Sequence, residues 1–147
     1  LELVTFLERN VTLDEWHVSF NGLAFDSQIT EHILRNKEQL LEQEGDTIAR
    51  FLYNKSQLII GRSRDGEFPE FGARDLSIRQ IDVFKLNHWD NPAKRSSLKW
   101  IQYTMDWKNI MDMPIHHTTE VVEAQIPEII KYWDHSWDCI TNEAFLN

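Results

Sequence analysis

Hydrophobic positions at the start of the chain recur with the spacing of amphipathic helices. Residues 1–8 fit a short helix or a strand, and we favour the helix. Thr12 and Glu15 have the spacing of a capping box, in which each side chain satisfies a free backbone N–H of the first helical turn. We therefore expect a second helix over residues 13–20, ended by the Asn-Gly pair that follows it.

A longer amphipathic helix is predicted after this turn. Asp26 or Ser27 supplies its N-cap, and Gly45 with Asp46 should end it. Apolar side chains return every three or four positions in between, which places them on one buried face. The predicted buried stripe consists of Ile29, Ile33, Leu34, Leu40 and Leu41.

Residues 47–62 allow two interpretations. One is a helix that continues through Tyr53, and the other is a hairpin whose strands, 47–53 and 57–62, are joined by an Asn-Lys-Ser turn. Apolar runs this short fit both periods. We favour the hairpin, because aromatic and β-branched residues flank turn-forming residues.

The middle of the chain predicts a loop followed by a second hairpin. Residues 64–72 contain two Gly and one Pro, which is typical of a loop. Residues 76–86 are rich in Ile, Val and Phe and indicate a strand, and residues 98–107 offer apolar side chains on two alternating faces. An antiparallel hairpin with a long loop would join these two strands.

A final amphipathic helix is predicted from Ile126 onward. Its apolar stripe would consist of Ile126, Ile129, Ile130, Trp133, Trp137, Ile140 and Ala144. The sequence as a whole therefore predicts an α+β fold in a single globular domain, residues 1–147. It would have N-terminal helices, a mainly antiparallel sheet of about four strands, and this C-terminal amphipathic helix packed on the sheet.

Composition fits an ordinary globular protein of 147 residues, with 41% hydrophobic and 27% charged residues. Apolar runs fall far short of the ~20 residues that cross a bilayer, and no signal peptide is visible. Cys139 is the only cysteine, which excludes an internal disulfide. We therefore expect a cytoplasmic protein without a membrane span.

The net charge of −9 is unevenly distributed along the chain. Residues 1–105 hold 16 acids against 13 bases, whereas residues 106–147 hold 8 acids against 2 bases. Nucleic acids and anionic membranes repel such a surface. A basic protein partner is attracted instead, with faster association at low salt.

No catalytic, metal or cofactor site is predicted. His135 and Cys139 lie one helical turn apart, but a structural zinc site needs four ligands and the chain has no second cysteine. The same pair lacks the burial, the orienting group and the oxyanion donor that a cysteine nucleophile requires. No glycine-rich phosphate loop is present either.

Charge and aromatic residues together favour a non-enzymatic acidic protein-binding domain. We expect an inhibitor or an immunity or antitoxin-like protein that occludes a basic protein partner, because interfaces favour aromatic anchors ringed by charge. The contact residues predicted for this partner are Asp106, Trp107, Asp112, Asp134 and Asp138. The sequence predicts no oligomeric state.

A small α+β pocket protein is the alternative. Its cleft would bind a cationic or aromatic small molecule, or host a simple cofactor-free enzyme. The predicted lining consists of Phe51, Phe84, Trp100, Tyr103 and Trp107. Acidic and aromatic residues on an exposed patch would favour the binding domain, whereas their convergence on a cavity would favour the pocket.

Overall fold

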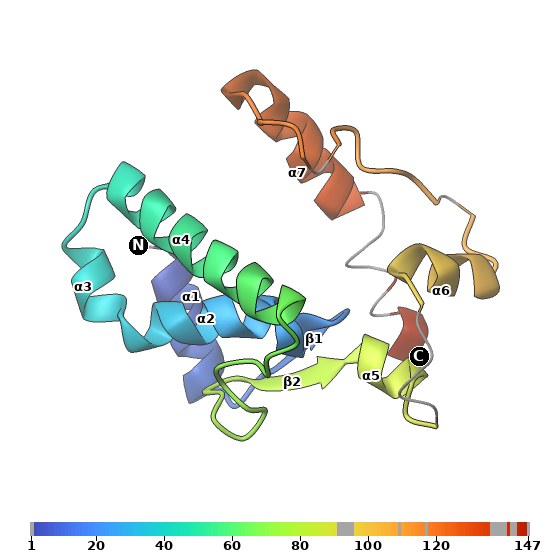
Figure 1. Ribbon diagram of the computed structural model, residues 1–147, viewed down its shortest axis with the longest axis horizontal. Helices are drawn as coiled ribbons and strands as arrows, with labels where there is room; N and C mark the ends of the chain where they lie inside the picture. The colour runs from blue at the N-terminus through green and yellow to red at the C-terminus, as the bar shows by residue number, and fades with distance from the viewer. Residues whose placement is uncertain are drawn as a thin grey trace. The chain divides into compact units, whose positions relative to one another are not determined.

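The computed structural model describes residues 2–90, 96–108, 110–116, 118–135, 141 and 144–146. The chain forms two compact units, residues 1–82 and residues 83–147 (Figure 1). Compact units of this kind also occur within single domains, so the expectation of one globular domain stays a prediction.

The predicted fold class is wrong. The described residues are mostly helical, and their only sheet has two parallel strands, β1 (Trp16–Ser19) and β2 (Arg79–Asp82). Trp16 lies opposite Arg79 and Ser19 lies opposite Asp82. A short hairpin cannot join parallel strands, which need a long crossover connection. The predicted, mainly antiparallel sheet of about four strands is therefore absent from the described residues.

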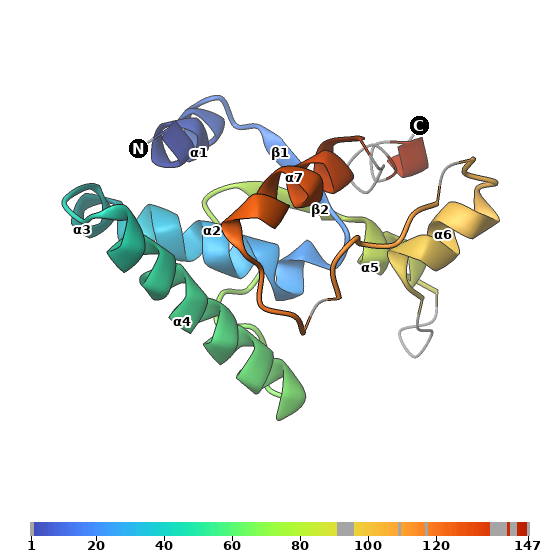
Figure 2. The ribbon, with the colours of Figure 1, turned by 90° about the horizontal axis from the view of Figure 1, so that it is seen from above.

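Helices form the crossover of the N-terminal unit. After α1 (Glu2–Thr12) and β1, the chain forms η1 (Gly22–Ala24), α2 (Asp26–Arg35), α3 (Lys37–Leu41) and α4 (Gly45–Arg64) before it reaches β2. Figures 1 and 2 both show α4 running back in the direction opposite to α2, with α3 joining them at one end. The predicted helix after Asp26 therefore forms as two shorter helices.

The predicted helix over residues 13–20 is also wrong. Thr12 lies in the last turn of α1, where its hydroxyl donates to the carbonyl of Glu8 at 2.9 Å. It therefore does not cap a following helix. The chain instead leaves α1 through Asp14 and enters β1.

The hairpin predicted for residues 47–62 is replaced by α4. The side of α4 that faces the unit carries Ile48, Leu52, Lys55 and Ile59, at spacings of three and four residues. Lys55 is buried on this face, although a lysine ordinarily marks an exposed or turn position. This buried lysine conceals the helical period in the sequence.

The predicted second hairpin, with strands at residues 76–86 and 98–107, does not form. Residues 79–82 form β2, but α5 (Val83–Asn87) follows at once, and residues 98–104 form α6 (Leu98–Thr104) rather than a strand. Ser97 caps α6, because its hydroxyl accepts the N–H of Trp100 at 3.2 Å. After η2 (Glu123–Gln125), a helix does begin at Ile126, as α7 (Ile126–His135).

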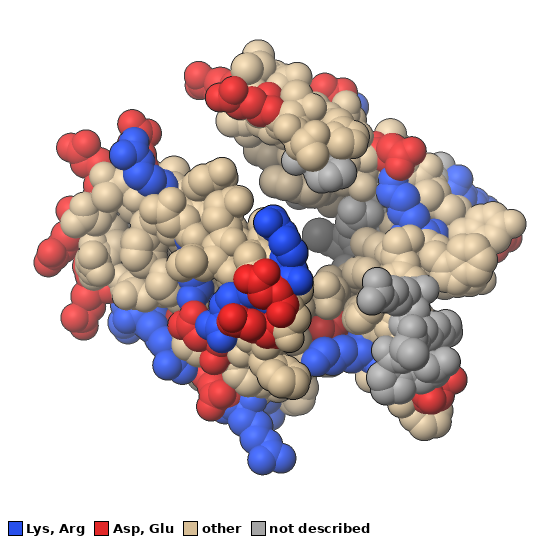
Figure 3. Space-filling model, in the orientation of Figure 1, with Lys and Arg blue, Asp and Glu red and all other residues tan. Residues whose placement is uncertain are grey.

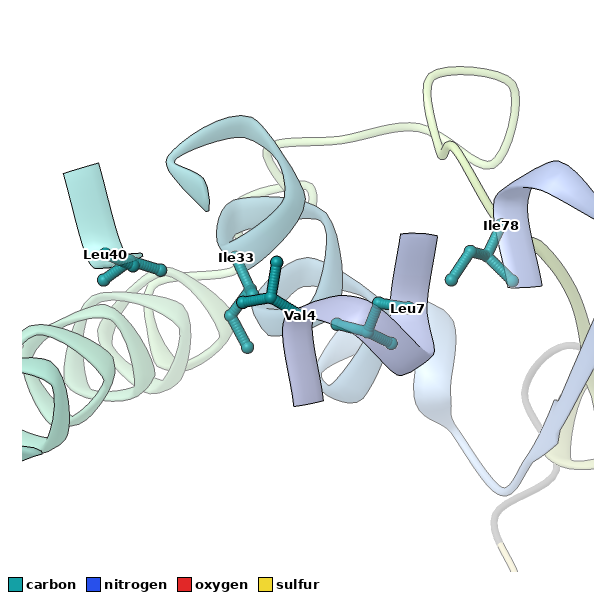
Figure 4. Close-up of a cluster of buried hydrophobic side chains, with 5 residues drawn as sticks. All are labelled: Val4, Leu7, Ile33, Leu40 and Ile78. Carbon is teal, nitrogen blue, oxygen red and sulfur yellow. The ribbon is translucent and has the colours of Figure 1, made fainter. Parts of the chain in front are cut away.

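The hydrophobic core of the N-terminal unit lies between α1, α2, α3 and the segment before β2. Five side chains form it, namely Val4, Leu7, Ile33, Leu40 and Ile78. Figure 4 shows Val4 beside Ile33, with Leu40 and Ile78 at opposite ends of the row. Their burial is the main favourable contribution to folding of this unit.

Buried polar side chains of α2 hold the segment between α4 and β2. Glu31 is 2% exposed and accepts the N–H and the hydroxyl of Ser77 at 2.7 and 3.1 Å, as well as Arg35 Nε at 2.7 Å. One turn earlier, the Gln28 amide makes two hydrogen bonds with the backbone of Phe71, at 2.8 and 2.9 Å. These bonds fix the course of the chain that leads into β2.

Three helices end with the same backbone arrangement. Asp14, Gly66 and Asp106 follow the last turns of α1, α4 and α6, and their φ angles are 53°, 75° and 54°. In each case the next N–H reaches the carbonyl five residues earlier, at 2.9 to 3.0 Å. This is the Schellman motif, in which the left-handed residue is most often glycine.

Replacing Glu31 with Ala should lower the free energy of unfolding by about 2 kcal/mol, because the Ser77 amide and Arg35 lose a charged acceptor. Ser77→Ala removes only the hydroxyl bond and should cost about 0.5–1 kcal/mol. Denaturant unfolding followed by circular dichroism measures both. Equal effects of the two variants would contradict the role given to Glu31.

Gly66→Ala should lower the free energy of unfolding by about 1 kcal/mol, because Ala is strained at positive φ. No atom lies within 4 Å of the added Cβ, so the cost is purely conformational. Asp106→Gly should have the opposite sign, a gain of about 0.5 kcal/mol. Loss of stability in Asp106→Gly, measured by tryptophan fluorescence during unfolding, would show that the carboxylate itself is needed.

Candidate functional site

An open apolar groove lies in the N-terminal unit, at the end of the core near α3. Its volume is about 370 Å³. Four helices and the turn before α4 supply its lining, which consists of Leu3, Val4, Ile33, Leu40, Leu41, Gln43, Gly45, Ile48 and Leu52. Apart from Gln43 and Gly45, every lining residue carries an aliphatic side chain.

The groove has a buried floor and an exposed edge. Val4, Ile33 and Leu40 form the floor and are between 5% and 7% exposed. Leu3 and Leu41 stand at the edge, at 53% and 45% exposed. Apolar surface of this kind is favourable to cover, at about 25 cal/mol per Å² removed from water.

Acidic residues alternate along the sequence with the lining residues Leu41, Gln43 and Gly45. Residues 38–49 contain Glu38, Glu42, Glu44 and Asp46 but no Lys or Arg. All four residues are exposed. Figure 3 shows acidic side chains over α3 and the start of α4, on the left, with a basic side chain among them. Within the described part of the chain, Glu42, Glu44 and Asp46 form no ion pair. We call Glu42, Glu44 and Asp46 the acidic rim.

The two structural units divide the charge differently from the two halves of the sequence. Residues 1–82 hold 15 acids against 9 bases, a net charge of −6, and residues 83–147 hold 9 acids against 6 bases, a net charge of −3. Four of those six bases lie before residue 106 and share a unit with the acidic C-terminal segment. The acid excess is therefore larger in the unit that contains the groove.

Three of the predicted contact residues lie around α6. Asp106 is exposed but serves as the left-handed residue that ends α6. Trp107 is partly buried, and its backbone N–H donates to the carbonyl of Gln102 at 2.9 Å. Asp112 is ion-paired with Lys99. The structure thus brings Asp106 and Trp107 together in one turn and pairs the Asp112 carboxylate with a base.

The other two predicted contact residues belong to the C-terminal segment. Asp134 lies in the last turn of α7, and Asp138 lies outside the described residues. Along the same helix Ile126, Ile130 and Trp133 are 45%, 46% and 51% exposed, so this part of the predicted stripe is not fully buried. The partner-binding role of the five residues stays a prediction.

A second, smaller cavity of about 80 Å³ lies between α4 and the loop after it. Lys55 is buried beside it, and Lys55 Nζ is 2.7 Å from Glu70 Oε2. Arg62 Nη1 is 3.7 Å from the same oxygen, and Arg62 Nε is 3.1 Å from Glu67 Oε2. Two bases thus face two acids, so the cavity offers no excess charge to a ligand.

The ion pairs fasten the loop over α4. Hydrogen bonding to Lys55 lowers the pKa of Glu70 below its ordinary value of 4.5, with further lowering by the nearby charges of Lys55 and Arg62. His32 stacks on Phe51 nearby, and burial lowers its pKa, followed by the positive charge of Lys55. The cluster therefore supports structure, since each charge has an internal partner.

Neither a candidate metal site nor a membrane-spanning helix is found among the described residues. No group of three or more His, Cys, Asp or Glu side chains there could hold a metal ion. No helix in that part of the chain has the length and apolar character needed to cross a membrane.

The net charge, counted over residues 1–105 and 106–147, gave no indication of the groove or of the acidic residues next to its lining. Leu40 and Leu41 were expected to be buried together, but the structure buries Leu40 and leaves Leu41 about half exposed. The run of four acids without a base over residues 38–49 was the one local signal.

Comparison with protein-family models, with curated proteins and with solved structures found no match to this chain.

Glu70→Gln should lower stability at neutral pH by about 1 kcal/mol, because buried Lys55 loses its charged partner. The folded pKa of Glu70 is depressed, so its contribution is complete above pH 4.5 and is lost as the pH falls below that value. Melting curves from neutral pH to about pH 3 should therefore show the difference between wild type and Glu70→Gln disappearing in acid. Glu67→Gln, which removes an exposed pair on the same loop, is the control and should have little effect. A difference independent of pH would contradict this assignment.

Proposed function

We propose that this chain is a non-enzymatic acidic binding domain that captures a basic, partly apolar segment of a protein partner in the groove. The observation that carries the proposal is an open aliphatic groove whose lining residues Leu41, Gln43 and Gly45 alternate in sequence with exposed carboxylates that form no ion pair in the described part of the chain. An inhibitor or an antitoxin-like protein blocks its partner when the segment that it covers belongs to the partner's active site or binding surface.

Apolar contact and charge contribute differently to such binding. Burial of partner side chains against Leu3 and Leu41 supplies affinity, because these residues are about half exposed in the free chain. The acidic rim speeds the encounter and selects basic partners, and both effects weaken as salt screens the charges. Tight and salt-sensitive association is the expected behaviour.

A small-molecule function is the second candidate. The groove volume of about 370 Å³ falls within the range of roughly 300–1,000 Å³ typical of ligand pockets. A cationic amphiphile would place its tail on the aliphatic lining and its head group near the acidic rim.

A cytoplasmic location is part of the main proposal and rests on the single cysteine, because a reducing compartment suits a chain without disulfides.

The test uses a flexible peptide of about 18 residues built from Leu and Lys, with a Leu and Glu peptide of equal length as the negative probe. The Leu and Lys peptide should bind, and raising salt from about 0.05 to about 0.5 M should weaken it at least ~10-fold. Glu42→Gln, Glu44→Gln and Asp46→Asn combined should slow association about 10-fold. Amides are used because Asp46 is in the first turn of α4, where lysine would oppose the helix dipole.

The matched control carries Asp112→Asn, Asp134→Asn and Asp138→Asn, which remove the same number of charges from the predicted C-terminal contacts. Stopped-flow fluorescence compares the two triple variants. Equal slowing by both would mean that total charge, not the rim, attracts the partner. Binding of dodecyltrimethylammonium without binding of the peptide would replace the main proposal by the small-molecule function.

A further inference from the structure

We infer that the partner segment which this groove takes is an amphipathic α-helix with a basic flank. The inference rests on the proposed function and adds the conformation of the bound segment. Three observations carry it: the backbone of the groove walls, the pattern of aliphatic residues, and the position of the acidic rim.

Helices, not strands, line the groove. Leu3 and Val4 belong to α1, Ile33 to α2, Leu40 and Leu41 to α3, and Ile48 and Leu52 to α4. None of the lining residues lies in a strand, so these walls offer an extended peptide no strand edge to pair with. A segment that enters an aliphatic groove must therefore satisfy its own backbone, which an α-helix does.

The two strands of the unit lie outside this lining. β1 and β2 pair with each other, and neither contributes a residue to the groove. Addition of a partner strand would need the outer edge of β1 or β2 and would leave the groove empty. The mode of recognition here is therefore a helix in a groove.

Aliphatic side chains at i, i+3, i+4 and i+7 of a partner helix form the stripe that fits such a lining. Glu42 and Glu44 stand on either side of the lining residue Gln43, and Asp46 follows the lining residue Gly45, so the acidic rim lies next to this part of the lining. Lys or Arg on the matching flank of the partner helix would face Glu42, Glu44 and Asp46. This arrangement gives the bound helix a preferred direction as well as a preferred face.

Two peptides of identical Leu and Lys composition test the conformation. In one, Leu follows the helical spacing, and in the other Leu and Lys alternate as in a strand. The helical peptide should bind at least ~10-fold more tightly. Its far-UV circular dichroism should gain helical signal on binding, beyond the sum of the separate spectra.

Single substitutions at the groove edge provide a second readout. Leu41→Asn should weaken binding of the helical peptide about 5-fold or more, because an exposed part of the apolar contact is lost. Leu58→Asn is the matched control, since Leu58 is 65% exposed on α4 and does not line the groove. It should leave the affinity unchanged.

The outcomes separate the inference from the proposed function. Equal affinity for the helical and the alternating peptide, with the rim variant weakening both, would overturn the helical conformation and leave the acidic binding domain standing. Failure of both peptides to bind would overturn the proposed function, and the inference with it. Weakening by Leu58→Asn as strong as that by Leu41→Asn would place the helix elsewhere and overturn the groove.

Discussion

The hydrogen bonds that Glu31 and Gln28 make from α2 to the segment after α4 hold the N-terminal unit together. Both side chains are almost fully buried, and both bind backbone groups more than 40 residues away in sequence. They guide the chain from the end of α4 into β2, where it can pair with β1. Because buried polar groups are costly when unpaired, few other paths of this segment would satisfy them.

The groove is a consequence of this arrangement. The ion pair between Lys55 and Glu70 links the C-terminal half of α4 to the loop after it, and Phe51 and Leu52 pack α4 against the hydrophobic core. At the opposite end of this helix, near α3 and the turn before α4, the aliphatic residues Leu3 and Leu41 are about half exposed beside the core. Structural charges and candidate binding charges are therefore separated in space: the former are paired around the loop, and the latter remain unpaired beside the apolar surface.

Part of the helical content could be predicted from the sequence, but α4, α5, α6 and the parallel sheet could not. Helices at the start of the chain, after Asp26 and after Ile126 followed from hydrophobic period. The prediction of a hairpin failed at α4 because Lys55 occupies a buried position and Asn54-Lys55-Ser56 resembles a turn. The capping box predicted at Thr12 is wrong, because the Thr12 hydroxyl donates to the carbonyl of Glu8 in the preceding helix. A threonine can end one helix in this way or begin the next, and the local sequence permits both.

The sequence by itself determined the acid excess, the absence of a disulfide, and several helices whose signals are local in the chain. Only the tertiary structure decided which carboxylates remain unpaired. Asp112 meets Lys99, and Glu70 meets Lys55, whereas Glu42, Glu44 and Asp46 meet no base in the described residues. The reason is physical: hydrophobic period and capping act between near neighbours, but ion pairing and groove formation depend on which distant segments the folded chain brings within a few ångströms.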